Sequence, residues 1–424
     1  MTMVLSASER NRLILHRQQF SALHNKMYFN FGGQGPMPQS AIESIQKVHQ
    51  TLQKLGPFSW DAGVFSVKET EKTRQMIAQE IQVSPKTITL TQNVLSGCNI
   101  PLWGINWQAG DHILLSDCEY PAVVATVQEL QYRFGIEYSV CPLMDTLNTG
   151  DPLAIINNHL RPTTRLVILS HVLWNTGQVL PIKEMIAACH HYGRRPSESK
   201  SSQSQDHAEN KVWVLVDAAQ SVGVLPLNVA DLNADFYAFT GHKWWCGPPG
   251  LGALYIHPNA YNAIRPTFIG WRGVVKDEQG NPVGFHDDGQ RFEVSTYDVT
   301  SMIALREAIT LHNQWGTADD RYKRLTDLGA YLLQQLQAIP QLHCFRNSPP
   351  ESGLIFFQIK DYQSLQIEDA HAAFVRELEK QGFLLRTILT PDCIRACVNY
   401  MTLESEIDAL VAAIQVLLSK FSPW

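Results

Sequence analysis

Short runs of β-branched and aliphatic residues alternate with amphipathic helical patterns through the first two thirds of the chain. The runs that predict strands are TITLT (87–91), HILLS (112–116), IEYSV (136–140), RLVILS (165–170), VWVLVD (212–217), FYAFT (236–240) and GALYI (252–256). Several are apolar throughout, as strands buried on both faces must be. Helical patterns lie between most of them, for example over 67–82, 120–134 and 181–192. This alternation predicts an α/β fold with a mostly parallel sheet of seven strands and helices on both faces.

The pattern changes near residue 300. Two long helical patterns precede the strand-like runs GLIFFQI and CIRACVNY and a final helix from about residue 403. We therefore expect three parts: an N-terminal segment (1–40) packing on the small domain, a large domain (41–290) and a smaller C-terminal α+β domain (291–424). The segment 194–210 is too poor in apolar residues to bury itself, and we expect a flexible insertion there.

Composition excludes several classes of protein. The chain has 424 residues, of which 45% are hydrophobic and 17% charged, as in ordinary globular proteins. Its formal net charge of −6 and the lack of a long basic run argue against nucleic-acid binding. No stretch has the uncharged apolar length of a membrane helix, and we read the first 20 residues as a helix rather than a signal peptide. The eight cysteines form neither a CxxC pair nor a zinc-type pattern, which indicates reduced thiols, a cytoplasmic protein and no metal.

Polar residues end two of the predicted strands. Asp217 closes VWVLVD, Thr240 closes FYAFT, and His242 and Lys243 follow directly after it. The carboxyl ends of neighbouring parallel strands meet at one edge of a sheet, where ligands bind. The acid and the lysine can therefore face one ligand. Each also has a structural explanation, since Asp217 can cap a helix and Lys243 can sit solvated in a turn.

Pyridoxal phosphate (PLP) requires such a set of groups. Its aldehyde needs a lysine amine, and its ring nitrogen needs a carboxylate partner. Its phosphate needs hydroxyls, amides and a cation, often at a helix N-terminus. Thr240 and His242 are placed to hold the phosphate beside Lys243. The run TQNVLSGCN (91–99) supplies Ser96 and Gly97 at the opening of a helix.

With these motifs in this order, nearly the whole chain resembles the class V aminotransferases among the fold type I PLP enzymes, a family that includes the cysteine desulfurases. The resemblance implies Lys243 as the Schiff-base lysine and Asp217 as the partner of the ring nitrogen. It implies a homodimer in which Thr296 of RFEVST reaches the neighbouring subunit's phosphate. The other residues that it places around the cofactor are Ser96, Gly97, Tyr120, Asn175, Gln220, Thr240 and His242.

Longer blocks, among them MYFNFGGQGPMP, RLVILSHVLWNTGQVLPI, AFTGHKWWCGPPGLGALYIHP and LRTILTPDCIRACVNY, are similar to a narrower branch, the cyanobacterial C-S lyases of L-cysteine and L-cystine. This similarity implies β-elimination to pyruvate, ammonia and persulfide or sulfide, with iron–sulfur cluster supply as the purpose. It implies Arg386 and Arg395 as ligands of substrate carboxylates, with Gln34 and Trp271 also at the substrate. A guanidinium fork suits a carboxylate, although either arginine can instead form a structural ion pair.

A cysteine desulfurase needs a mobile thiol on the loop before its carboxylate-binding arginine. Here only eight residues separate Arg386 from Arg395, and the cysteines nearby, Cys393 and Cys397, are read as structural. The short loop favours elimination. A class V aminotransferase, a cysteine desulfurase and an amino-acid epimerase stay open as alternatives.

Two positions depart from the pattern of the relatives. Tyr120 stands where they carry histidine, and we count it as catalytic because an aromatic ring can stack on the pyridine. A phenol is a poorer proton shuttle at neutral pH than an imidazole, so rate or reaction can differ. Leu95 stands where threonine is common.

Overall fold

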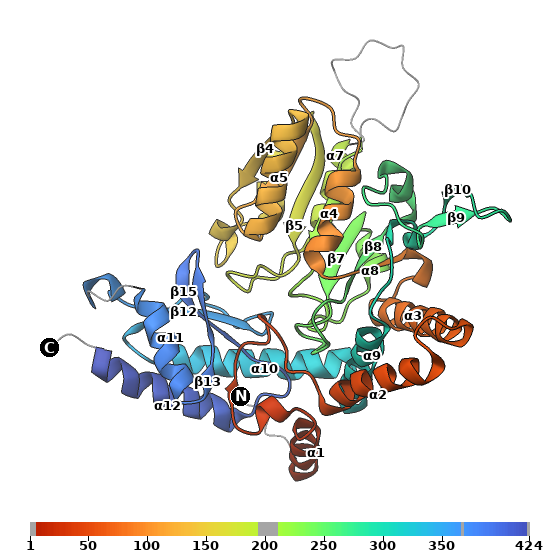
Figure 1. Ribbon diagram of the computed structural model, residues 1–424. Coiled ribbons are helices and arrows are strands. Elements are labelled where there is room, and N and C mark those ends of the chain that lie inside the picture. The colour runs from red at the N-terminus through yellow and green to blue at the C-terminus, as the bar shows by residue number, and fades with distance from the viewer. Residues whose placement is uncertain (1–5, 194–210, 366–368, 422–424) are drawn as a thin grey trace.

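The structure is a computed structural model that describes residues 6–193, 211–365 and 369–421 (Figure 1). The insertion predicted at 194–210 lies outside these residues. The helices are α1 (Ala7–Arg17), α2 (Gln39–Leu55), α3 (Trp60–Glu80), α4 (Val94–Gly104), α5 (Pro121–Phe134), α6 (Pro152–His159), α7 (Ile182–Gly193), α8 (Val229–Leu232), α9 (Val299–Trp315), α10 (Ala318–Gln337), α11 (Ala370–Lys380) and α12 (Glu404–Phe421).

The central sheet has seven strands in the order β2-β8-β7-β6-β5-β3-β4. The strands β3 to β7 run parallel, and β8 is antiparallel to both β7 and β2. The predicted α/β fold is confirmed, with every predicted strand within one residue of an observed one. Their bounds are β2 (Ile88–Thr91), β3 (His112–Ser116), β4 (Glu137–Cys141), β5 (Thr164–Ser170), β6 (Trp213–Asp217), β7 (Phe236–Thr240) and β8 (Gly252–Ile256).

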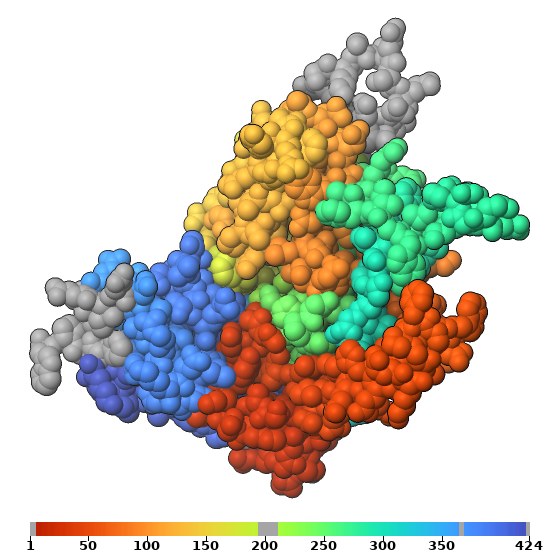
Figure 2. All heavy atoms as spheres, viewed as in Figure 1, coloured from red at the N-terminus to blue at the C-terminus, as the bar shows by residue number. Residues whose placement is uncertain are grey.

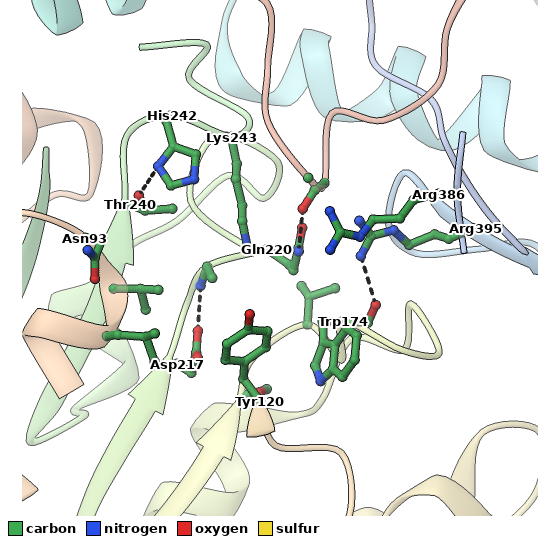
Figure 3. A pocket seen from close by; sticks show the side chains of 17 residues that line it. Asn93, Tyr120, Trp174, Asp217, Gln220, Thr240, His242, Lys243, Arg386 and Arg395 are labelled. Atoms are coloured by element: carbon green, nitrogen blue, oxygen red, sulfur yellow. Dashed lines mark hydrogen bonds between the residues drawn. The ribbon is translucent and has the colours of Figure 1, made fainter. Parts of the chain in front are cut away.

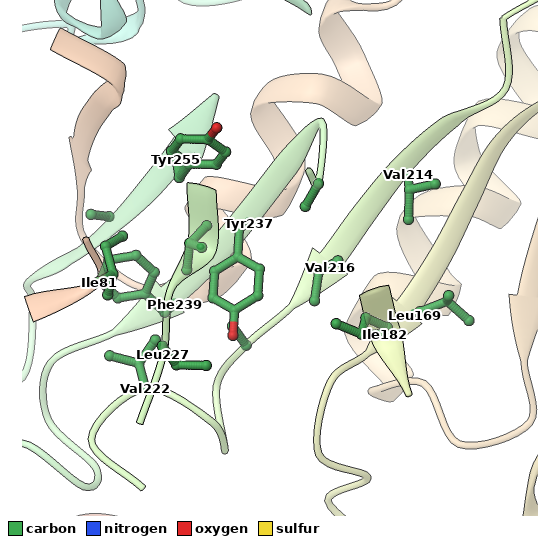
Figure 4. Close-up of a cluster of buried hydrophobic side chains, with 14 of the residues drawn as sticks. Ile81, Leu169, Ile182, Val214, Val216, Val222, Leu227, Tyr237, Phe239 and Tyr255 are labelled. Carbon is green, nitrogen blue, oxygen red and sulfur yellow. The ribbon is translucent and has the colours of Figure 1, made fainter. Parts of the chain in front are cut away.

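Both faces of this sheet are covered, which explains why its strands are apolar throughout. On β6, Val214 and Val216 join the core on one face, while Trp213 and Leu215 join the core on the other. Figure 4 shows the first of these cores, where Tyr237 and Phe239 from β7 pack beside the two valines. The sheet is thus a rigid platform for side chains at its carboxyl edge.

The C-terminal part forms a second, antiparallel sheet in the order β11-β12-β15-β14, packed on α10, α11 and α12. The remaining strands are β1 (Met27–Tyr28), β9 (Val274–Lys276), β10 (Pro282–Phe285), β11 (Leu342–Cys344), β12 (Leu354–Ile359), β13 (Phe383–Leu384), β14 (Arg386–Leu389) and β15 (Asp392–Cys397). Helix α9 instead contributes Val299, Met302 and Leu305 to the core of the large sheet.

The N-terminal segment packs against the C-terminal part, as the neighbouring red and blue spheres in Figure 2 show. Strand β1 pairs in parallel with β13, and the Cys397 amide donates to the Phe29 carbonyl over 2.8 Å. The Arg17 guanidinium forms an ion pair of 2.6 Å with Glu406. These contacts support the predicted position of the segment, while the three-part division of the chain stays a prediction. No helix in the described part of the chain combines the length and apolarity needed to span a bilayer.

Candidate active site

A cavity of about 290 Å³ opens at the carboxyl ends of β5, β6 and β7 (Figure 3). We call it the Lys243 pocket. The large sheet, the N-terminal segment and the C-terminal hairpin β14–β15 all contribute to its wall. The lining residues are Gly32, Gly33, Asn93, Val94, Leu95, Tyr120, Ser170, Val172, Trp174, Asp217, Ala219, Gln220, Thr240, His242, Lys243, Arg386 and Arg395.

Asp217 at the end of β6 and Lys243, three residues beyond the end of the neighbouring strand β7, both point into this pocket. Burial lowers the pKa of the Lys243 amine to about 8, although the Asp217 carboxylate opposes the shift. Burial also raises the pKa of Asp217, against the hydrogen bond of 2.9 Å that its Oδ1 accepts from the Ala219 amide. Among the described residues, the Lys243 amine has no hydrogen bond or ion pair. It is therefore available to a ligand.

The N-terminus of α4 forms one end of the pocket. Asn93 caps this helix, since its Oδ1 accepts the Ser96 amide over 3.0 Å. Thr240 and His242 stand beside it, joined by a hydrogen bond of 2.6 Å between Oγ1 and Nδ1. A helix N-terminus offers free N–H groups and a partial positive charge, so this end suits an anion such as a phosphate. Leu95 lines the pocket at this end too.

Gly97 and Ser96 lie behind this end rather than in the pocket wall. A Cβ added at Gly97 would come within 3.0 Å of the Ala238 Cβ, so glycine permits the close approach of α4 to β7. Ser96 instead lines a neighbouring cavity of about 410 Å³ together with Phe268 and Tyr297. For both residues the structure shows how the helix is placed, and contact with a cofactor stays a prediction.

Gln220 has both ends of its side chain engaged. Its Nε2 donates to the Gly32 carbonyl over 2.9 Å, and its Oε1 accepts the Trp244 indole N–H over 2.9 Å. A Cβ on Gly32 would lie 2.9 Å from the Leu354 side chain and 3.1 Å from the Cys397 sulfur. The glutamine thus holds the N-terminal segment against the pocket, and its predicted place near the cofactor stays untested.

Arg386 and Arg395 face the pocket from paired strands of the C-terminal sheet. Arg395 is only 2% exposed, and its Nη1 donates to the Trp174 carbonyl over 3.2 Å. Its buried Nε has no partner. Neither arginine forms an ion pair within the described residues, so the structural explanation of these charges does not hold. Two guanidinium groups are free to bind carboxylates.

Tyr120 borders the pocket opposite the lysine and is 44% exposed. Its ring meets the Trp174 ring edge to face, with centroids 5.7 Å apart. The pair forms an aromatic wall, which suits a planar ligand. Stacking of Tyr120 on a pyridine ring stays a prediction.

Besides Ser96 and Gly97, four predicted residues lie outside the pocket wall. The Asn175 amide turns toward the Thr390 carbonyl, 3.5 Å away, because Trp174 takes the inward position after β5. Gln34 and Thr296 are exposed, and Trp271 is 55% exposed. The single chain thus does not bring these residues into the pocket wall, and their contact with a cofactor or substrate stays a prediction.

The two cysteines near the arginines, Cys393 and Cys397, belong to β15 and are fully buried. Burial raises the pKa of the Cys393 thiol to about 12 and also raises that of Cys397. A thiol that stays protonated is a poor nucleophile. This geometry supports the structural reading of both cysteines.

Sequence reasoning missed Asn93, Trp174, Gly32 and Gly33. Asn93 carries the usual signal of an N-cap between a strand and a helix, which could have marked the anion end. The two glycines, which precede the next lining residue in the sequence, Asn93, by 60 residues or more, give no local signal of their place. The lysine amine, the carboxylate and the helix N-terminus together match the three chemical demands of PLP.

Comparison with known proteins agrees with this geometry. The family model described as "Aminotransferase class-V" matches residues 27–195 and 201–410. Two solved structures of the cystine C-S lyase C-DES are 45% identical with a TM-score of 0.87. One holds glycine covalently linked to the PLP cofactor and covers 94% of this chain and 98% of that chain. The other holds the reaction product cysteine persulfide and covers 93% and 99%.

Two curated relatives are more distant. A cysteine desulfurase from Klebsiella pneumoniae is 28% identical over 355 residues, covering 81% of each chain. The isopenicillin N epimerase of Streptomyces clavuligerus is 26% identical over 411 residues, covering 92% of this chain and 94% of the relative.

Proposed function

Because the chain belongs to the class V aminotransferase family, we propose that it is a PLP-dependent carbon–sulfur lyase that cleaves L-cystine, and less readily L-cysteine, by β-elimination. The products are pyruvate, ammonia and persulfide or sulfide sulfur. The observation that carries the proposal is the hairpin β14–β15, which presents two unpaired arginines and no accessible thiol to the pocket. C-DES, with 45% identity, is named as a cystine C-S lyase.

The residues of the pocket divide into three groups around the cofactor. The α4 N-terminus with Thr240 and His242 would hold its phosphate, Asp217 its ring nitrogen, and Lys243 its aldehyde carbon. When bound, PLP supplies an electron sink for the charge left at the substrate Cα. Tyr120 and Trp174 would cover the ring from the side.

The protein's own groups bind the substrate and move its proton. Arg395, buried and unpaired, would hold the carboxylate of the reacting half, and Arg386, more exposed, the second carboxylate of cystine. With its pKa lowered to about 8, the Lys243 Nζ is partly neutral at physiological pH and can accept the Cα proton. The Cβ–S bond then breaks, and Nζ can return the proton to the departing sulfur. A persulfide leaves more readily than a thiolate, which favours cystine.

The proposal also covers the oligomeric state of the enzyme and its location in the cell. We propose a cytoplasmic homodimer in which Thr296 contributes to the phosphate site of the neighbouring subunit. Thr296 and Trp271 are exposed in the single chain, and Phe268 and Ile269 beside them are 73% and 61% exposed, as an interface requires. Iron–sulfur cluster supply is the proposed destination of the sulfur.

A substrate panel tests the proposal. The protein is incubated with PLP and, separately, cystine, cysteine, alanine plus a keto acid, and single enantiomers of amino acids. Pyruvate and ammonia from cystine support a lyase. A new amino acid formed only with a keto acid would mean an aminotransferase. Loss of optical activity without other products would mean an epimerase, an alternative that we test because one relative, from Streptomyces clavuligerus, is named as an epimerase.

A further inference from the structure

The carboxyl group of Glu119 is buried directly behind the wall of the Lys243 pocket and has no part in the reaction described above. It lies just beyond β3 and is 5% exposed. Its Oε1 accepts the Ser116 hydroxyl over 2.6 Å and the Ser170 amide over 3.0 Å, while its Oε2 lies 2.8 Å from the Ser170 hydroxyl. Three hydrogen bonds therefore fix this carboxyl in one orientation.

Ser170 connects this buried carboxyl to Asp217. It ends β5, lines the pocket, and lies directly opposite Asp217 in the register of β5 and β6. The chain of contacts thus runs from Glu119 through Ser170 to the strand that carries Asp217. Asp217 is itself 6% exposed, so two carboxyl groups are buried at one end of the pocket.

Two buried carboxylates so close together cannot both ionise without cost. Burial raises the pKa of Glu119 to about 7, and the negative charge of Asp217 adds to the shift, while the bonds from Ser116 and Ser170 oppose it. Asp217 has the Lys243 amine to favour its charged form. Among the described residues Glu119 forms no ion pair and has only serine partners, so its ionised form lacks the cation that Asp217 has in Lys243, and Glu119 is the more readily protonated of the two.

The thiols and the imidazole around Glu119 do not change charge near neutral pH. Burial raises the pKa of the neighbouring thiols, which stay protonated, and lowers the pKa of His171 to about 4, so that this ring stays neutral. Asp117 is exposed, and its Oδ1 accepts the Met144 amide over 3.0 Å. The thiols concerned are Cys98, Cys118 and Cys141.

We propose that Glu119 is a positioning residue for Asp217: it holds a proton against Ser170, so that Asp217 and not Glu119 carries the negative charge beside the cofactor's ring nitrogen. The inference rests on the proposed function for the identity of the cofactor. The protonation of Glu119 itself does not depend on the identity of the cofactor and can be measured in the apoprotein. Ser170, hydrogen-bonded to Glu119 and paired with Asp217 in the register of β5 and β6, lies between the two residues.

The test follows the carboxyl C=O stretch by difference infrared spectroscopy of the apoprotein from about pH 5 to about pH 9, in wild type, Glu119→Gln and Ser116→Ala. Wild type loses one protonated-carboxyl band with a midpoint of about 7. Glu119→Gln lacks this band. Ser116→Ala moves the midpoint upward, because the hydroxyl that favours the ionised form is gone. Melting temperatures establish that each variant is folded.

The absorption spectrum of bound PLP is then titrated over the same range. We expect its pH dependence to include the same midpoint in wild type and to lose it in Glu119→Gln. Titration of Glu119 at the ordinary value of a glutamate would overturn the inference, and so would identical cofactor titrations in wild type and Glu119→Gln. A protein that takes up no PLP would refute the proposed function, while the apoprotein titration would still decide whether Glu119 holds a proton.

Discussion

Arg386 and Arg395 lie directly opposite each other on the antiparallel strands β14 and β15, at the mouth of the pocket that holds Lys243. Like charges opposite each other in a sheet are unfavourable, and neither arginine has a carboxylate partner in the described residues. Binding of an anionic ligand would offset the repulsion between the two guanidinium groups. Cystine, with two carboxylates, matches the two guanidinium groups.

The arginine pair predicts a difference between substrates. Arg395→Lys is expected to reduce kcat/KM about a hundredfold or more for both cystine and cysteine, since a buried bidentate contact is lost. Arg386→Lys is expected to reduce kcat/KM for cystine by about tenfold with much less effect on cysteine. Arg133→Lys is a matched control, because Arg133 is exposed and pairs with Glu129 on α5. Equal losses for both substrates in Arg386→Lys would contradict this division of roles.

The lowered pKa of Lys243 predicts how fast the apoprotein binds PLP at different pH values. Only the neutral amine attacks an aldehyde, and burial moves its pKa to about 8. The rate constant for binding, measured by absorbance, should therefore rise with pH up to about 8 and then level off. Lys243→Ala should take up PLP without fixation by borohydride. A rate that still rises steeply above about pH 10, where an ordinary lysine titrates, would contradict the shift.

Replacement of Cys393 distinguishes a β-elimination mechanism from a desulfurase mechanism. We expect Cys393→Ala to change the turnover of cystine by no more than about twofold, because its buried thiol cannot reach the substrate. Cys344→Ala is the control, because Cys344 is a second buried cysteine of the same sheet, on β11, which β12 separates from β15. If Cys393→Ala is folded but abolishes sulfur release, the protein is a desulfurase.

Asn93 combines capping of α4 with a place in the pocket wall. Asn93→Ala should destabilise the fold by about 1 kcal/mol, measured by denaturant unfolding of the apoprotein. It should also weaken PLP binding, since it disturbs the helix N-terminus that faces the phosphate. Asn228 caps α8 in the same way, far from the pocket, so Asn228→Ala should affect stability alone. Unchanged PLP affinity in Asn93→Ala would place the phosphate elsewhere.

The platform of the site could be predicted because its signals are local. A strand buried on both faces must be apolar throughout, and so the run that ends at Asp217 and the run that ends at Thr240 were recognisable as neighbours in a parallel sheet. That in turn put Asp217 and Lys243 at one edge of the sheet. The chemistry of these residues then pointed to PLP.

The remaining wall depends on contacts that the sequence does not display. Whether Trp174 or Asn175 turns inward is decided by the backbone after β5, where Val172 pairs with Val179. The engagement of Gln220 with Gly32 joins segments 188 residues apart. The burial of Glu119 against Ser170, 51 residues away in the sequence, has no signal in the spacing of the chain either.

The most direct test of the lyase is the stoichiometry of products from cystine with the PLP-loaded protein and no reductant or keto acid. The account predicts one pyruvate and one ammonia for each cysteine persulfide formed, with no alanine. Alanine in place of pyruvate, with sulfur retained on the protein, would contradict β-elimination and make the enzyme a desulfurase.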